Sequence, residues 1–124
     1  MQHVEYGTHN LQTIILLHGG GLSWWNYRDV AQLLSDRFHV VLPILDGHAG
    51  SDAPFTSIED NAARIIAHID EHFGGKVLAV GGLSLGGQIR WSWSILRSLK
   101  FLVRAFTIWY VGATFSKPLR GIAF

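Results

Sequence analysis

The chain has 124 residues, 48% of them hydrophobic and 15% charged, with a formal net charge of +1. This composition excludes a disordered chain, and the charge gives no reason to expect nucleic acid as a partner. Because cysteine is absent, disulfides, thiolate metal sites and a cysteine nucleophile are excluded as well. The polar N-terminal segment has no apolar stretch of the signal-peptide type, and residues 101–115 are too short, and interrupted by Arg104, to span a bilayer. We therefore expect a single cytoplasmic domain without a transmembrane segment.

Three short apolar runs predict the strands of a buried sheet. They are residues 13–17, 38–42 and 76–80, each stopped by glycine or proline close behind. Because these runs are apolar on both faces, they are typical of a parallel sheet that helices cover on both sides. Residues 46–52 are rich in glycine and other turn-forming residues, and we expect them to form a loop.

Two helices are predicted between these strands. The first follows Ser23, which we expect to cap it. Its apolar residues recur at helical spacing, namely Trp24, Tyr27, Ala31 and Leu34. The second begins with a pair resembling a capping box, Ser57 and Asp60, and ends at the two glycines of residues 74–75. Its apolar stripe consists of Ile58, Ala62, Ile65, Ile66, Ile69 and Phe73. The alternation of strands and helices indicates an α/β fold with a parallel sheet and helices on both faces.

Residues 82–86, directly after the third strand, have the sequence Gly-Leu-Ser-Leu-Gly. This is the G-x-S-x-G pattern, in which the serine occupies a sharp, strained turn between a strand and a helix. The flanking glycines let the strand and the helix pass closely, so that the Ser84 hydroxyl projects beside the positive end of the helix. Ser84 is therefore a candidate nucleophile.

Residues 18–21, His-Gly-Gly-Gly, follow the first strand. Glycines in this place let backbone N–H groups approach a tetrahedral oxyanion, alongside the N–H of Leu85. In parallel sheets, reactive groups lie on the loops at the carboxyl ends of the strands. His18, Asp46 and Ser84 each follow one of the three strands, and we expect all three at that edge.

Four segments together resemble the α/β-hydrolase superfamily, the group of esterases, lipases, carbon–carbon bond hydrolases and peptidases. They are residues 16–21, 25–28, 42–51 and 82–88, and the resemblance covers residues 12–88. It implies a partial α/β-hydrolase fold with three to four strands, truncated after the helix that follows the serine.

The resemblance also implies a site. Ser84 would be the nucleophile, and the N–H of Gly20 or Gly21 together with that of Leu85 would form the oxyanion hole. The reaction would be hydrolysis of a small ester-like or activated carbonyl substrate through an acyl-enzyme, without a metal or a cofactor.

The residues that would complete a catalytic triad are missing in the family order. The family places an acid and then a histidine after the serine, but here no Asp or Glu follows Glu71 and no His follows His72. We therefore expect this chain to be an impaired hydrolase. His18, His48 and Asp46 are candidates to line the site, although both histidines sit in loop motifs where the family uses such residues to hold loops together.

His68 and His72 lie four residues apart, a helical spacing that places both rings on one face. Such a pair resembles half of a metal site, but no third ligand accompanies it in the sequence. We interpret the two histidines as part of a solvated helix face and expect no metal site.

The composition changes at Gln88, because all nine acidic residues precede it and six of the ten basic residues follow it. Three interpretations of residues 89–124 stay open. A frameshift near Ile89 would make them an unselected tail. A genuine, divergent continuation would form a helix over residues 85–103 and a strand over residues 105–112. A basic amphipathic helix would suit an anionic membrane surface or a partner groove.

The third interpretation supplies an alternative function, that of a non-catalytic binding or membrane-surface protein that uses the basic tail. Residues 1–124 would in each case form one incomplete domain. Because a sheet of three or four strands exposes an apolar edge, we also expect self-association.

Overall fold

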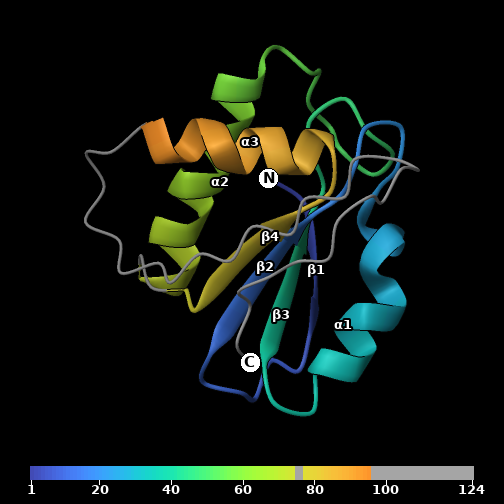
Figure 1. Cartoon of the computed structure of the whole chain (residues 1–124), viewed down its shortest axis with the longest axis vertical. Helices are drawn as coiled ribbons and strands as arrows, with labels where there is room; N and C mark the ends of the chain where they lie inside the picture. The colour runs from blue at the N-terminus through green and yellow to red at the C-terminus, as the bar shows by residue number, and fades with distance from the viewer. Residues whose placement is uncertain (75–76, 96–124) are drawn as a thin grey trace, which may run out of the picture.

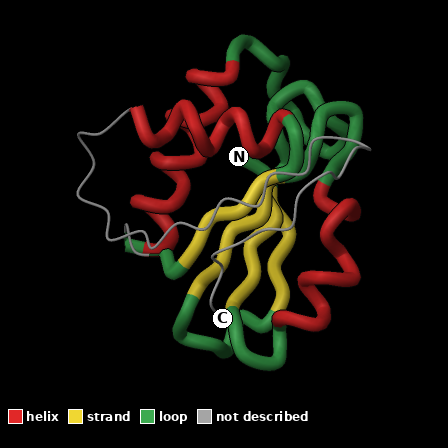
Figure 2. The backbone as a smooth tube through the Cα atoms, viewed as in Figure 1, coloured by secondary structure: helices red, strands yellow, loops and turns green. Residues whose placement is uncertain are grey.

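The computed structural model of the protein describes residues 1–74 and 77–95. Its centre is a four-stranded sheet with the strand order β1-β3-β2-β4, and helices lie on both faces of this sheet (Figure 1, Figure 2). In chain order the elements are β1 (His3–Tyr6), β2 (Thr13–Leu17), the 3-10 helix η1 (Trp24–Tyr27), α1 (Arg28–Leu34), β3 (His39–Pro43), α2 (Ile58–Phe73), β4 (Ala79–Gly82) and α3 (Leu85–Ile95).

The parallel part of the sheet is as predicted, since β2 pairs in parallel with β3 on one side and with β4 on the other. The strand β1 is absent from the sequence prediction. It pairs antiparallel with β3, with Val4 opposite Leu42. Val4 and Tyr6 pack toward the core, whereas Glu5 between them is exposed. The polar N-terminal segment therefore forms one edge of the sheet.

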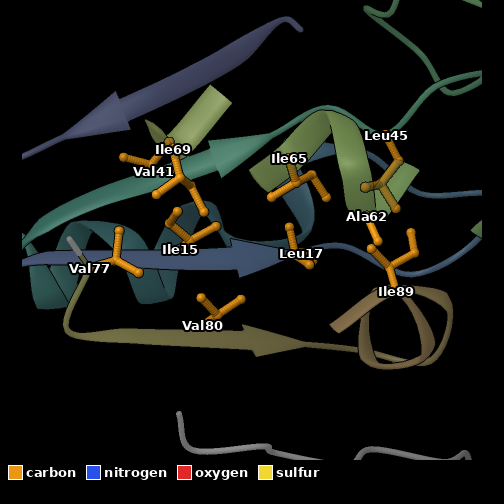
Figure 3. Packing of buried hydrophobic residues seen from close by; sticks show 10 residues of the cluster. All are labelled: Ile15, Leu17, Val41, Leu45, Ala62, Ile65, Ile69, Val77, Val80 and Ile89. Atoms are coloured by element: carbon orange, nitrogen blue, oxygen red, sulfur yellow. The ribbon is translucent and has the colours of Figure 1, made fainter. Parts of the chain in front are cut away.

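The larger part of the core lies between the sheet and the helices α2 and α3 (Figure 3). Here the apolar stripe predicted for α2 meets side chains of β2, β3 and β4. The buried members are Ile15, Leu17, Val41, Leu45, Ala62, Ile65, Ile69, Val77, Val80 and Ile89. Since each fully buried aliphatic side chain contributes about 2 kcal/mol, this cluster is the main apolar contribution to stability.

A smaller cluster fills the opposite face of the sheet, beneath α1. Ala31 of α1 and both Val40 and Leu42 of β3 are buried there. Val41 between them belongs to the larger cluster, because successive side chains of a strand point to opposite faces. β3 is thus buried on both faces, which explains its uninterrupted apolar sequence.

The helix α2 begins and ends as the sequence predicts. The Oγ of Ser57 accepts a hydrogen bond of 3.0 Å from the backbone N–H of Asp60, which satisfies one of the free N–H groups at the helix start. At the other end Gly74 adopts the left-handed conformation, with a φ of 61°. Gly75 lies outside the described residues.

Two details of the prediction are wrong. Ser23 does not cap the first helix with its side chain, because its Oγ donates a hydrogen bond of 2.6 Å to the carbonyl oxygen of Ala49. It therefore connects the loop after β2 to the loop after β3, and the helix starts as η1. β4 lies further along the chain than predicted, because Gly82 still pairs with Leu17 of β2.

The helix α3 begins at Leu85 and is described as far as Ile95. The rest of the helix predicted over residues 85–103, the strand predicted over residues 105–112 and most of the basic tail lie outside the described residues. Ile89 is fully buried in the larger cluster. Over residues 1–74 and 77–95, no helix is long and apolar enough to cross a membrane.

The end of β4 and the start of α3 lie very close to each other and to β2. The space between them is too small for a side chain. A Cβ built on Gly82 would lie 2.3 Å from the carbonyl carbon of Gly86. A Cβ built on Gly86 would lie 2.2 Å from the carbonyl oxygen of Leu17. Both distances are far below van der Waals contact and both obstructing atoms are backbone. The two glycines that flank Ser84 are therefore required by packing.

Gly86→Ala is expected to lower the free energy of unfolding by about 3 kcal/mol, because the added methyl group meets backbone that has no other rotamer to adopt. Gly87→Ala is the matched control one residue later. Its Cβ would lie 3.4 Å from its nearest neighbour, the carbonyl oxygen of Gly82, and alanine favours a helix by about 1 kcal/mol over glycine. Urea unfolding of the two variants measures the difference, and equal stabilities would contradict the close approach.

Candidate active site

Ser84 occupies the turn between β4 and α3 with a φ of 49°. Among the described residues, it alone of the non-glycine residues has a positive φ. This conformation costs an L-amino acid about 1–3 kcal/mol, and such strain persists only where the surrounding structure enforces it. The side chain is exposed and directly precedes the first turn of α3, whose free N–H groups and dipole favour negative charge. The geometry is that of a nucleophile turn.

The glycine-rich loop after β2 lies against this turn. A Cβ built on Gly19 would lie 3.5 Å from the carbonyl oxygen of Leu83, and one built on Gly20 would lie 3.7 Å from Cδ2 of Leu85. Gly21 has a φ of 74° and open space around its Cβ position. Within the described part of the chain, no hydrogen bond uses the backbone N–H of Gly20, Gly21 or Leu85. These N–H groups, at the junction of the two segments, therefore remain candidates for an oxyanion hole.

His18 is fully buried beneath this loop, and both of its ring nitrogens are in hydrogen bonds. Nδ1 donates to the carbonyl oxygen of Gly19 at 2.9 Å, and Nε2 accepts from the backbone N–H of Leu45 at 3.1 Å. Burial lowers the pKa of His18, an effect that outweighs the hydrogen bond to Gly19. A neutral ring with both nitrogens occupied holds two loops together and has no free lone pair with which to take a proton.

Asp46 follows β3 and is held by α2. Its side chain is 2% exposed, and its Oδ2 accepts a hydrogen bond of 2.9 Å from the guanidinium of Arg64. Its backbone N–H donates to Oδ1 of Asn61 at 3.0 Å. The half-buried His48 donates from Nδ1 to the carbonyl oxygen of Asp46 at 3.0 Å, and its ring centre lies 5.0 Å from that of His18. The structure therefore brings His18, Asp46 and His48 together in one connected set of loops.

Two partners of this loop, Asn61 and Arg64, are not among the residues predicted from the sequence. Asn61 is fully buried, and Arg64 follows it by three residues, so both project from the same face of α2. That spacing is the signal that the sequence offers. A polar residue inside an apolar helix face is itself an indication of a specific hydrogen-bond partner.

The interpretation of His68 and His72 as a solvated face is wrong for one of them. His72 is exposed, but His68 is only 6% exposed. The reason is the unpredicted strand β1, whose His3 ring packs edge-on against His68 with 4.6 Å between the ring centres.

Comparison with known proteins places the chain among hydrolases. The sequence model of the Alpha/beta hydrolase family matches residues 14–122, a range that runs well past Gln88. The soluble epoxide hydrolase of Corynebacterium sp. (strain C12) is 31% identical over 77 residues, which cover 61% of this chain and 27% of that protein. The uncharacterized hydrolase YugF of Bacillus subtilis (strain 168) is 30% identical over 87 residues, covering 68% of this chain and 32% of that protein.

Solved structures agree in fold. A protein assigned to the alpha/beta hydrolase family from Desulfitobacterium hafniense matches with a TM-score of 0.73 and 25% identity, over 86% of this chain and 43% of that one. A thermophilic esterase from Thermogutta terrifontis matches with a TM-score of 0.69 and 26% identity, over 81% of this chain and 37% of that one. The predicted partial α/β-hydrolase fold is confirmed, and the chain spans less than half the length of each of these relatives.

Acid is expected to destabilise the fold below about pH 6.5. Burial, together with the neighbouring His3 and His72, lowers the pKa of His68 from 6.5 to about 4, and burial lowers that of His18 as well. Between these values the unfolded chain binds more protons than the folded chain, so the free energy of unfolding falls as the pH falls. His68 alone accounts for a loss of about 3 kcal/mol by pH 4.

Urea unfolding between pH 7.5 and pH 4 measures this slope. His68→Leu removes the buried titrating group and is expected to make the profile shallower, whereas His9→Gln, at an exposed loop position, should leave it unchanged. A profile that His68→Leu does not alter would show that His68 titrates normally in the folded protein.

Proposed function

Because this chain belongs to the alpha/beta hydrolase family, we propose that it contains the nucleophile half of a serine hydrolase acting on a small ester-like or activated carbonyl substrate. The observation that carries the proposal is the φ of 49° at Ser84, in a turn fixed by two glycines beside the glycine-rich loop. A strained serine in a turn that lies against a loop with unused N–H groups is the arrangement that acyl transfer needs.

The reaction proceeds in two steps. Oγ of Ser84 attacks the substrate carbonyl carbon, and the negative charge that forms on the carbonyl oxygen is stabilised by the N–H groups of Gly20 or Gly21 and Leu85. Collapse of this tetrahedral intermediate releases the alcohol and leaves the acyl group on Ser84. Water then attacks the acyl-enzyme through a second tetrahedral intermediate and releases the acid.

The identity of the nucleophile favours esters over epoxides, although both an epoxide hydrolase and an esterase are among the relatives. A serine oxygen that opened an epoxide would form an ether bond to the enzyme, and water does not cleave an ether under mild conditions. A serine oxygen that attacks an ester forms another ester, which water does cleave. Turnover through Ser84 is therefore consistent only with an acyl substrate.

Neither His18 nor Asp46 is free to act as the general base for Ser84. His18 is neutral and has both ring nitrogens in hydrogen bonds, and the Asp46 carboxylate is bonded to Arg64. No acid or histidine follows Ser84 in the sequence. The chain should therefore turn over esters roughly a thousandfold or more slowly than an enzyme with a complete triad, through the oxyanion hole and the strained nucleophile.

Ser84→Ala is expected to abolish the slow hydrolysis of p-nitrophenyl acetate by the full chain and the acyl adduct that accompanies it. Ser35→Ala is the matched control, because the Ser35 hydroxyl bonds only the local carbonyl of Gln32 at the end of α1. Absorbance at the p-nitrophenolate band gives the rate and intact-protein mass gives the adduct. An adduct of equal size on Ser84→Ala would remove Ser84 from the mechanism.

Added imidazole tests the absent base directly. If only the base is missing, imidazole should accelerate the wild-type chain beyond its own background reaction, and the excess should disappear in Ser84→Ala. An identical imidazole response in both proteins would show that Ser84 does not depend on an external base. The Ser35→Ala variant should behave as the wild type.

A further inference from the structure

Three histidine rings from two elements meet beside a surface pocket. The ring centres of His68 and His72 on α2 are 4.1 Å apart, and that of His3 on β1 lies 4.6 Å from His68 and 6.1 Å from His72. The pocket has a volume of about 320 Å³ and is lined by Met1, His3, Arg64, Ala67, His68, Glu71 and His72. No residue of the nucleophile turn or of the glycine-rich loop lines it, so it is distinct from the candidate active site.

One nitrogen of this cluster has no partner. The Nε2 atom of His68 is buried and makes no hydrogen bond within the described residues, in a residue that is only 6% exposed. Buried polar atoms in native proteins are nearly always bonded, so a buried nitrogen of this kind indicates a ligand that supplies the missing contact. His68 is also one of the residues that line the pocket, so the buried nitrogen lies close to it.

Hydrogen bonds hold the two neighbouring rings in place. Nδ1 of His72 lies 3.0 Å from the carbonyl oxygen of His68, so Nδ1 is the donor and Nε2 keeps its lone pair. Nε2 of His3 donates to Oε1 of Glu5 at 2.6 Å, which holds this ring in place beside His68. A backbone carbonyl or a carboxylate behind the ring is the support that metal-binding histidines have.

The groups that line the pocket indicate the charge of the ligand. Arg64 and the N-terminal ammonium of Met1 would attract an anion, but Arg64 is bonded to Asp46, and Glu71 on the same pocket would repel an anion. On the exposed His72 the proton is on Nδ1, so Nε2 presents a lone pair and has no proton to donate to an anion. The cluster is therefore better suited to a cation.

We propose that His68 and His72 chelate a divalent transition-metal ion of the class that imidazole prefers, such as Ni²⁺, Cu²⁺ or Zn²⁺. Their spacing of four residues brings both rings to one face of α2. Over residues 1–74 and 77–95, no three histidine or acidic side chains are placed to hold an ion together. The proposed site is thus a two-nitrogen chelate whose remaining positions water fills from the pocket, and His3 packs against the first ligand to hold it.

Calorimetric titration of the full chain with NiCl₂ at pH 7.5 tests this site. We expect saturable binding of one ion per chain, lost in His72→Ala at the concentrations that saturate the wild type. His72 is exposed, so this variant should keep its fold, which circular dichroism checks. His9→Ala is the matched control for a second exposed histidine and should bind as the wild type does. MgCl₂ should not bind, because Mg²⁺ requires oxygen ligands.

Several results would overturn the proposal. They are no Ni²⁺ binding by the wild type, equal binding by wild type and His72→Ala, or loss of binding in His9→Ala. Binding of Mg²⁺ that equals that of Ni²⁺ would assign the pocket to oxygen ligands such as Glu71 and would also contradict a histidine chelate. None of these readouts depends on ester hydrolysis, so the test of the metal site is independent of the role of Ser84.

Discussion

The close backbone approach of α3 and β4 to the end of β2 is the constraint on which the rest of the site depends. Gly82 and Gly86 have no room for a Cβ, and the obstructing atoms belong to backbone at Leu17 and Gly86. The chain must turn sharply between the two glycines, and Ser84 takes up the left-handed conformation as a result. Because β2 also leads into the glycine-rich loop, the same approach sets the positions of Ser84 and of this loop relative to each other.

A second set of contacts holds these loops from behind. His18 bonds the glycine-rich loop on one side and the segment after β3 on the other. That segment is bonded in turn to Asn61 and Arg64 of α2. The charge of Asp46 is buried but paired, and removing its partner would leave an uncompensated carboxylate at large cost. The polar residues at this edge therefore act mainly on the positions of loops, and His18 has no unbonded ring nitrogen with which to act as a base.

The sequence predicts most of this architecture because its signals are local. Buried parallel strands are uninterrupted apolar runs. The helix α2 begins after Ser57 and ends at Gly74, and serine and glycine are the residue types favoured at these two positions. β1 escapes prediction because it is short and half exposed, with only Val4 and Tyr6 to mark it. That single omission produces the error at His68, since the ring that buries it comes from His3 on β1. Long-range contacts such as Arg64 to Asp46 leave only the weak signal of a shared helix face.

The turn at Ser84 also divides this region into positions that evolution must keep and positions that it is free to vary. The glycines at 82 and 86 admit no side chain, so every substitution there is penalised. Leu83 and Leu85 alternate with them, and these two residues lie against Gly19 and Gly20 of the neighbouring loop. A change in the size of either leucine would move the glycine-rich loop by small amounts while the serine stays in place. Selection can therefore adjust the shape of this junction in single steps without first losing the turn at Ser84.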